Sequence, residues 1–142
     1  MKISDILARK GSNVVTTGPD TTVGEFVQLL AEHRIGAIPV VTGSRLSGIV
    51  SERDVVRRLA TDGPGLLDEP VAGLMTTELI TCGPGDALDD IAALMTERRV
   101  RHLPVVVDGA LAGIVSIGDA VAARLRELEQ TQEQLESYIT RG

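Results

Sequence analysis

The chain repeats itself, and this repeat constrains the fold more than any other feature of the sequence. Residues 48–54 read GIVSERD, and residues 113–119, 65 positions later, read GIVSIGD. Residues 15–56 match residues 80–121 at roughly 16 of 42 positions without a gap, which is typical of a repeat architecture. The sequence therefore predicts two similar units rather than one irregular domain.

Each unit shows the same order of local patterns. Gly-Pro ends an extended segment, and apolar residues then recur at helical spacing, as at Val23, Phe26, Val27 and Leu30. Two β-branched runs and a second helix follow. The predicted fold class is α+β, with two pseudo-symmetric β-α-β-β-α repeats. Because a unit of about 55 residues has a small core of its own, we expect the repeats to pack through their sheets.

Composition divides the chain into four predicted segments. They are repeat 1 (residues 1–59), a linker rich in Gly, Pro and acids (60–70), repeat 2 (71–125) and a C-terminal helical extension (126–142).

A heptad stripe runs into the extension and has one polar position. Its members are Val121, Leu125, Leu128, Gln132, Leu135 and Ile139. A coiled coil and a helix docked on its own module both give such a stripe. In either case the extension is predicted to serve dimerisation or partner docking, and we expect a homodimer.

Composition also narrows the function classes. A net charge of −6 argues against nucleic acid as a partner, because binding to phosphate backbones needs a concentrated basic face. No signal-peptide core is present, and no apolar run approaches about 18 residues, so no membrane association is expected. The single Cys82 suits a reducing compartment, and we expect a cytoplasmic location. No catalytic or metal-binding motif is found, which predicts a protein that is not an enzyme and requires no metal.

The repeated motif itself has two possible roles. Ser51 and Ser116 are predicted to cap helices, with Asp54 and Asp119 in the first turn, where the helix dipole favours a carboxylate. The same helix start offers free N–H groups and a hydroxyl that suit a phosphate. A carboxylate can also accept two hydrogen bonds from a ribose diol. The motif is therefore either a structural cap or a binding site in a cleft between the repeats.

The order IPVV, GIVSERD, LPVV, GIVSIGD resembles a tandem pair of CBS (cystathionine-β-synthase-type) domains, a Bateman module, over about residues 1–125. The segments GIVSERDVVRRL, MTERRVRHLPVV and LESYI are similar to a stand-alone CBS-pair subfamily of bacteria and plant organelles. This resemblance implies that Asp54 and Asp119 bind the ribose of an adenine nucleotide. It implies that Ser51 and Ser116 approach its phosphate.

The resemblance also implies that apolar strand residues such as Ile38 and Leu103 clamp the adenine. AMP is the favoured ligand, with ATP and NAD(H) as alternatives. The implied function is a regulatory module that senses energy or redox state and signals to a protein target that the sequence does not identify. The alternative is a structural or interaction protein without a ligand, acting through dimerisation and the C-terminal helix.

The two predicted sites differ in their basic residues. Arg101 and His102 precede LPVV, where the family places phosphate contacts, whereas the first repeat has Gly36 and Ala37 there. We therefore expect Asp119 to be the stronger ribose anchor.

Two smaller differences concern the motif and a loop. The first motif carries Arg53 where the second has Gly118. Three extra residues in ARKGSNVV predict a longer loop, in which Ser12, Val14 and Thr16 lie over the other repeat's nucleotide. A plain solvent loop is the alternative.

Overall fold

A computed structural model describes residues 1–141, and Gly142, the last residue of the predicted extension, lies outside the described residues. The first half contains α2 (Val23–His33), β1 (Ala37–Thr42), β2 (Arg45–Ser51), α3 (Glu52–Asp62), η1 (Gly63–Asp68) and η2 (Val71–Gly73). The second half contains α1 (Ile3–Lys10), α4 (Leu88–Arg98), β3 (His102–Val107), β4 (Ala110–Ser116) and α5 (Ile117–Arg141).

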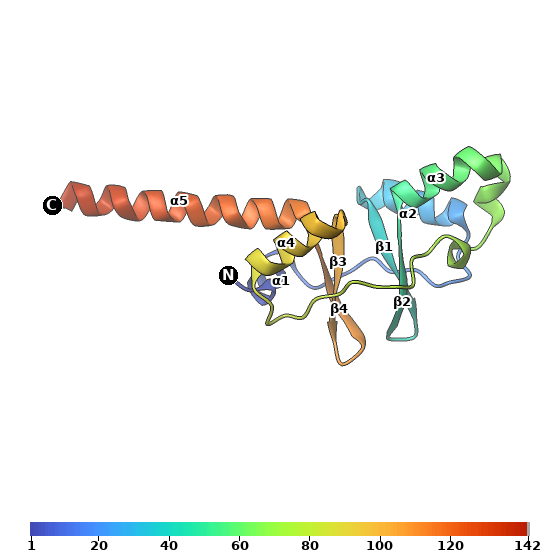
Figure 1. Ribbon diagram of the computed structural model, residues 1–142, viewed down its shortest axis with the longest axis horizontal. Helices are drawn as coiled ribbons and strands as arrows, with labels where there is room; N and C mark the ends of the chain where they lie inside the picture. Colours follow the sequence, from blue (N-terminus) through green and yellow to red (C-terminus); the bar gives the residue numbers. More distant parts are fainter. Residues whose placement is uncertain (142) are drawn as a thin grey trace.

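The strands form two hairpins with the same register. Ala37 pairs with Ser51 in the first hairpin, and His102 pairs with Ser116 in the second. The hairpins meet edge to edge in one four-stranded antiparallel sheet of order β1-β2-β4-β3 (Figure 1). The predicted α+β architecture of two pseudo-symmetric repeats is confirmed.

The first predicted strand of each repeat is reduced to a single bridge. Thr17 pairs in parallel with Val40, and Cys82 pairs in the same way with Val105. Gly-Pro follows each bridge, and proline has no N–H with which to continue a strand ladder.

Helix α1 begins the chain but packs in the second half. Ile3 and Ile6 are buried there beside Leu88 and Ile91. The N–H of Ile3 donates to the carbonyl of Asp86 at 3.0 Å, which fixes the start of the helix against this half.

The first half receives in return the segment that joins the repeats. Leu66 and Val71 are fully buried in its core, and the N–H of Val71 donates to the carbonyl of Thr21 at 2.8 Å. The predicted linker 60–70 thus contributes to a hydrophobic core. The packing exchanges two segments across the boundaries expected at residues 59 and 71.

A glycine of each GIVS motif lets the exchanged segment approach the sheet. A Cβ on Gly48 would lie 2.8 Å from Met75 Sδ, and a Cβ on Gly113 would lie 2.7 Å from Leu7 Cδ2. Leu7 and Met75 therefore occupy equivalent places in the two halves.

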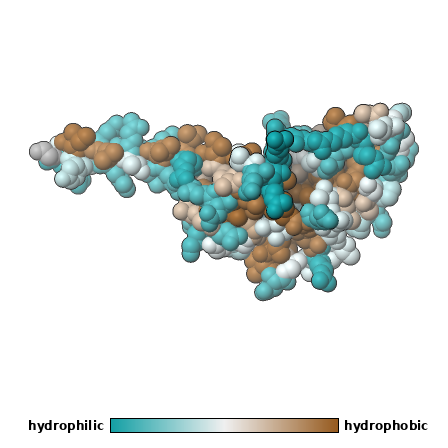
Figure 2. Space-filling view, in the orientation of Figure 1, coloured by the Kyte–Doolittle hydropathy of each residue, from teal (hydrophilic) through white to brown (hydrophobic). Residues whose placement is uncertain are grey.

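The second half of α5 extends away from the body (Figure 1), and hydrophobic side chains lie along it (Figure 2). Leu128 and Leu135 are each 58% exposed, and Ile139 is 75% exposed. This second half of the helix therefore does not pack on the rest of the chain, whereas Ala120 and Ala123 in its first half are buried in the second core. Among the described helices, none combines the length and the apolar character that a membrane crossing requires.

Candidate functional site

A cavity of about 300 Å³ lies where the first copy of the motif faces the second half of the chain. Residues of both hairpins and of the segment after η2 contribute to its wall. They are Gly36, Ala37, Ile49, Ser51, Glu52, Arg53, Asp54, Arg57, Thr76, Glu78, Leu79, Ile80, Arg99, Val100, Arg101, His102, Leu103 and Pro104.

The first motif forms a capping box at the start of α3. The Asp54 N–H donates to Ser51 Oγ at 3.3 Å, and Asp54 Oδ2 accepts from the Ser51 backbone N–H at 2.8 Å. The Ser51 hydroxyl is also placed to donate to that oxygen, at 3.0 Å. The predicted cap is present, and the same two side chains line the cavity. Capping therefore does not remove these groups from a ligand.

Four arginines give the cavity a basic rim. Arg53 and Arg57 come from consecutive turns of α3, whereas Arg99 and Arg101 come from the segment between α4 and β3. Within residues 1–141 none of the four forms a salt bridge. Arginine presents a planar fork of donors that matches phosphate oxygens, so this rim suits an anionic group.

His102 enters the cavity beside a glycine. A Cβ on Gly36 would lie 3.5 Å from His102 Cε1 and 3.3 Å from Glu52 Oε1, so the missing side chain leaves room for both groups. Burial lowers the pKa of His102, and Lys10 lowers it further, while Asp119 and Glu52 act in the opposite direction. A neutral imidazole can donate one hydrogen bond and accept another.

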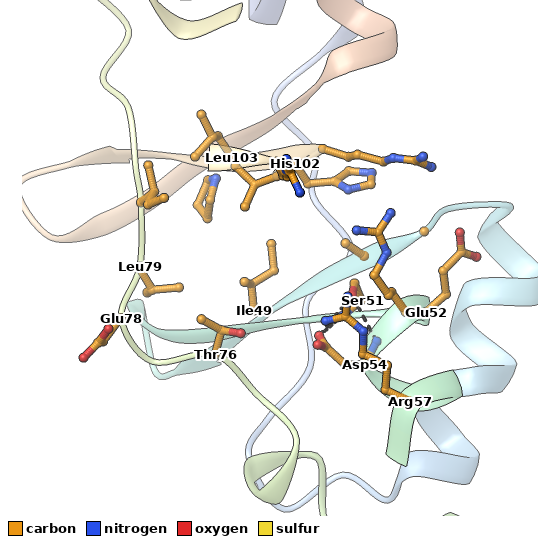
Figure 3. A pocket seen from close by; sticks show the side chains of 18 residues that line it. Ile49, Ser51, Glu52, Asp54, Arg57, Thr76, Glu78, Leu79, His102 and Leu103 are labelled. Atoms are coloured by element: carbon orange, nitrogen blue, oxygen red, sulfur yellow. Dashed lines mark hydrogen bonds between the residues drawn. The ribbon is translucent and has the colours of Figure 1, made fainter. Parts of the chain in front are cut away.

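Apolar side chains form the other part of the wall. Figure 3 shows Ile49, Leu79 and Leu103 gathered on one side, and Ser51 and Asp54 on the other. The cavity thus combines an apolar part with a separate polar end, which suits a ligand with an aromatic ring and a charged group.

The second copy of the motif has different surroundings. Asp119 accepts from the Ser116 backbone N–H at 2.9 Å, as in the first copy, but also from the Lys10 ammonium at 2.7 Å. Burial raises the pKa of Asp119, but the hydrogen bonds from Lys10 and Ser116 outweigh it, and the pKa lies below its ordinary value.

Some predicted site residues line the cavity and others lie elsewhere. The cavity brings together Ser51, Arg53, Asp54, Arg101, His102 and Leu103. Ile38 is fully buried in the first core instead.

The remaining predicted residues do not belong to this cavity. Ser116, Gly118 and Asp119 are at the second copy of the motif, and the loop residues Ser12, Val14 and Thr16 also lie outside the cavity wall.

The sequence predicts Arg101 and His102 beside Asp119. In the structure both line the cavity of Asp54, while His102 also pairs through its backbone with Ser116 and is near enough to Asp119 for that carboxylate to raise its pKa. The reason is that Gly36 leaves space for His102 next to Glu52. Arg101 and His102 therefore lie in the same cavity as Asp54.

Several residues of the site were missed by sequence reasoning. Arg57 follows Arg53 by four residues, so helical spacing could have placed the two on one face. Arg99 ends α4 in the left-handed conformation, and no local pattern connects it to Asp54. The signal for Lys10 was the three-residue insertion, which the sequence analysis assigned to a loop.

Comparison with known proteins gives one family. The model described as CBS domain matches residues 3–61 and 71–126. The mitochondrial CBS domain-containing protein CBSX3 of Arabidopsis thaliana is 35% identical over 149 residues, which cover 99% of this chain and 72% of CBSX3. The CBS-domain protein ATU1752 of Agrobacterium tumefaciens has a TM-score of 0.84 at 42% identity, covering 87% of this chain and 99% of that chain.

Two similar solved structures contain adenosine compounds. CBSX2 in complex with AMP has a TM-score of 0.74 at 30% identity, covering 88% of this chain and 96% of that chain. The CBS domain pair of MJ0100, in complex with 5′-methylthioadenosine and S-adenosyl-L-methionine, has a TM-score of 0.77 at 25% identity. The match covers 91% of this chain and 98% of that chain.

Proposed function

The chain belongs to the CBS-domain family, and from this premise we propose that it is a regulatory module that binds an adenine nucleotide in the cavity at Asp54. The observation that carries the proposal is that one cavity holds all three groups such a ligand needs. Asp54 accepts hydrogen bonds from the ribose diol, the unpaired arginines bind the phosphate, and the apolar wall of Ile49, Leu79 and Leu103 holds the adenine.

Charge and size favour AMP within this class. Four arginines face three carboxylates in the cavity wall, which leaves an excess of positive charge for a phosphate. S-adenosyl-L-methionine and methylthioadenosine carry no phosphate and would leave this rim unused. The volume of about 300 Å³ is at the lower end of ligand cavities and favours a mononucleotide over NAD(H).

Titration calorimetry against AMP, ATP, NADH and GMP tests the proposal. We expect AMP to bind more tightly than GMP, because the apolar wall offers no partners for the extra polar groups of guanine. The ligand is expected to be recovered unchanged after incubation, since the proposed role is sensing without catalysis. If no adenine nucleotide bound, the interaction-protein alternative would take its place.

We also propose that α5 mediates a homodimer. Val121, Leu125 and Leu128 are each more than half exposed and continue the heptad stripe to Ile139. The same stripe borders an apolar groove between α4 and α5 that includes Leu88. A second copy of the chain fits this surface because a heptad stripe is self-complementary.

Light scattering tests the dimer. Truncation after Leu125, or Leu128→Glu, is expected to give a monomer at micromolar concentration. Gln130→Glu, also exposed but off the stripe, is the matched control and is expected to stay dimeric. A monomeric wild-type chain would contradict the proposal.

The proposal includes a cytoplasmic location and a ligand that needs no metal. A cytoplasmic location is supported by the single, buried Cys82, which suits a reducing compartment. The Arabidopsis relative is described as mitochondrial. The proposed ligand needs no metal, and within residues 1–141 no group of three or more His, Cys, Asp or Glu side chains is arranged to hold one.

A further inference from the structure

The second copy of the motif binds a side chain of its own chain. The Lys10 ammonium donates to Asp119 Oδ2 at 2.7 Å and to the carbonyl of Ile114 at 3.0 Å. The first copy has no corresponding cation, because the hydrogen bonds that Asp54 accepts in the described chain all come from Ser51. The two aspartates therefore differ in what a ligand would have to displace.

The insertion in the first repeat explains how Lys10 reaches this place. In the first half, the N–H of Thr76 donates to the carbonyl of Ile49 at 3.0 Å. Ile114 is the repeat equivalent of Ile49, and its carbonyl accepts from the Lys10 ammonium instead. Three extra residues extend α1 by nearly one turn beyond Leu7, and Lys10 is the last residue of that turn.

We propose that Lys10 is a tethered occupant of the second motif, so that the chain binds one nucleotide, at Asp54, while Asp119 marks a latent second site. This inference rests on the function proposed for Asp54. A ribose diol offers two neutral donors, whereas Lys10 offers a charged donor that is already attached to the chain. A nucleotide must therefore displace Lys10 before its ribose can bind Asp119.

Because the Lys10–Asp119 ion pair is partly exposed, it opposes nucleotide binding only to a limited extent. The side chains of Lys10 and Asp119 are 35% and 23% exposed, and ion pairs of this kind resist competition only modestly. The latent site is thus weakened rather than destroyed. We expect AMP to bind at Asp119 at least about tenfold more tightly once Lys10 is replaced by an uncharged residue.

Calorimetric titration with AMP tests this on the full chain. Wild type is expected to bind one AMP per chain, Lys10→Met two, and Lys10→Met combined with Asp119→Asn one again. Arg9→Met removes the neighbouring cation of α1 and is expected to keep the wild-type stoichiometry. Lys10→Gln repeats the test with a polar side chain, and thermal unfolding shows that each variant is folded.

The outcomes separate this inference from the proposed function. Two AMP bound with equal affinity in wild type, or one AMP in both Lys10 variants, would overturn the role of Lys10 and leave the Asp54 site intact. No binding to wild type would refute the Asp54 site. A site that then appeared in Lys10→Met and disappeared with Asp119→Asn would still support the inference, and its absence in every variant would overturn both.

Discussion

The two copies of the GIVS motif share a backbone and differ in their surroundings. In both, the aspartate accepts a hydrogen bond from the backbone N–H of the serine, at 2.8 Å for Asp54 and 2.9 Å for Asp119. The first copy faces an arginine-lined cavity, whereas the second is paired with Lys10. Capping is therefore a local property of Ser-x-x-Asp, while the surroundings of the motif are formed by side chains from elsewhere in the chain.

Small sequence differences produce this divergence. Gly36 leaves room for His102 at the first copy, and the insertion before residue 11 delivers Lys10 to the second. Neither change alters the register of the hairpins, which is the same in both halves. Two repeats with the same fold thus differ in the side chains that surround the motif.

Asp54→Asn tests the comparison most directly and should have the largest effect. The variant keeps the size of the side chain but loses the charged acceptor of two hydrogen bonds. AMP affinity is expected to fall by on the order of a hundredfold, measured by calorimetry.

Asp119→Asn is the matched change in the other copy, and it is expected to leave the affinity of the cavity unchanged. An equal loss in the two variants would mean that both copies bind nucleotide equally, which would contradict the proposed difference between Asp54 and Asp119. Melting temperatures measured alongside separate a capping defect from a binding defect.

Gly48→Ala and Gly113→Ala compare the packing beneath the two motifs. A Cβ on Gly48 would lie 2.9 Å from the backbone carbonyl of Thr76 as well as close to Met75. The three atoms nearest to a Cβ on Gly113 all belong to the side chain of Leu7, which can move more easily than a backbone carbonyl. We expect Gly48→Ala to lower the free energy of unfolding by about 2 kcal/mol and Gly113→Ala by about 1 kcal/mol.

Thermal or urea unfolding of the two variants measures this difference. A larger loss of stability for Gly113→Ala would contradict the prediction. It would mean that Leu7 cannot move away from the added Cβ. Equal losses would show that side-chain and backbone neighbours constrain the sheet alike.

The repeat predicted most of the fold. The offset of 65 residues makes β1 the repeat equivalent of β3 and β2 the equivalent of β4, and the two hairpins have matching registers. The exchange of α1 into the second half was not predicted, because Ile3 and Ile6 show the same apolar spacing whichever core they enter. Such a contact is decided by the packing of distant segments, which leaves no local pattern.

The candidate site was predictable to a smaller extent. The motif and the resemblance identified Ser51 and Asp54, and helical spacing could have added Arg57. Arg99 lines the cavity of Asp54 and Lys10 pairs with Asp119. Both partners are far away in the sequence, so only the tertiary structure reveals these contacts. Sequence spacing alone also does not show that Arg101, which is close to Asp119 in the sequence, lines the cavity of Asp54 in the other half.

Arg99→Gln and Arg34→Gln use the repeat as an internal control. Both residues end a helix in the left-handed conformation, with φ of 56° and 53°, so backbone strain is matched. Only Arg99 lines the cavity. We expect Arg99→Gln to weaken AMP binding about tenfold, with little effect on adenosine, which lacks the phosphate. If the two substitutions changed the affinity for AMP equally, Arg99 would not bind the phosphate.

The smallest expected effect is a pH dependence of stability caused by His102. This residue interacts with charged groups near both copies of the motif. Burial, followed by Lys10, lowers the pKa of His102 below 6.5, so protonation favours the unfolded chain. Stability should therefore fall as the pH drops below about 6.5 towards the folded pKa. The pKa of Asp119 is lowered from 3.8, so its contribution is lost only at more acidic pH. Lys10→Met should raise the pKa of His102, measured by NMR, and reduce the loss of stability near pH 6; an unchanged pKa would show that the two copies are electrostatically independent.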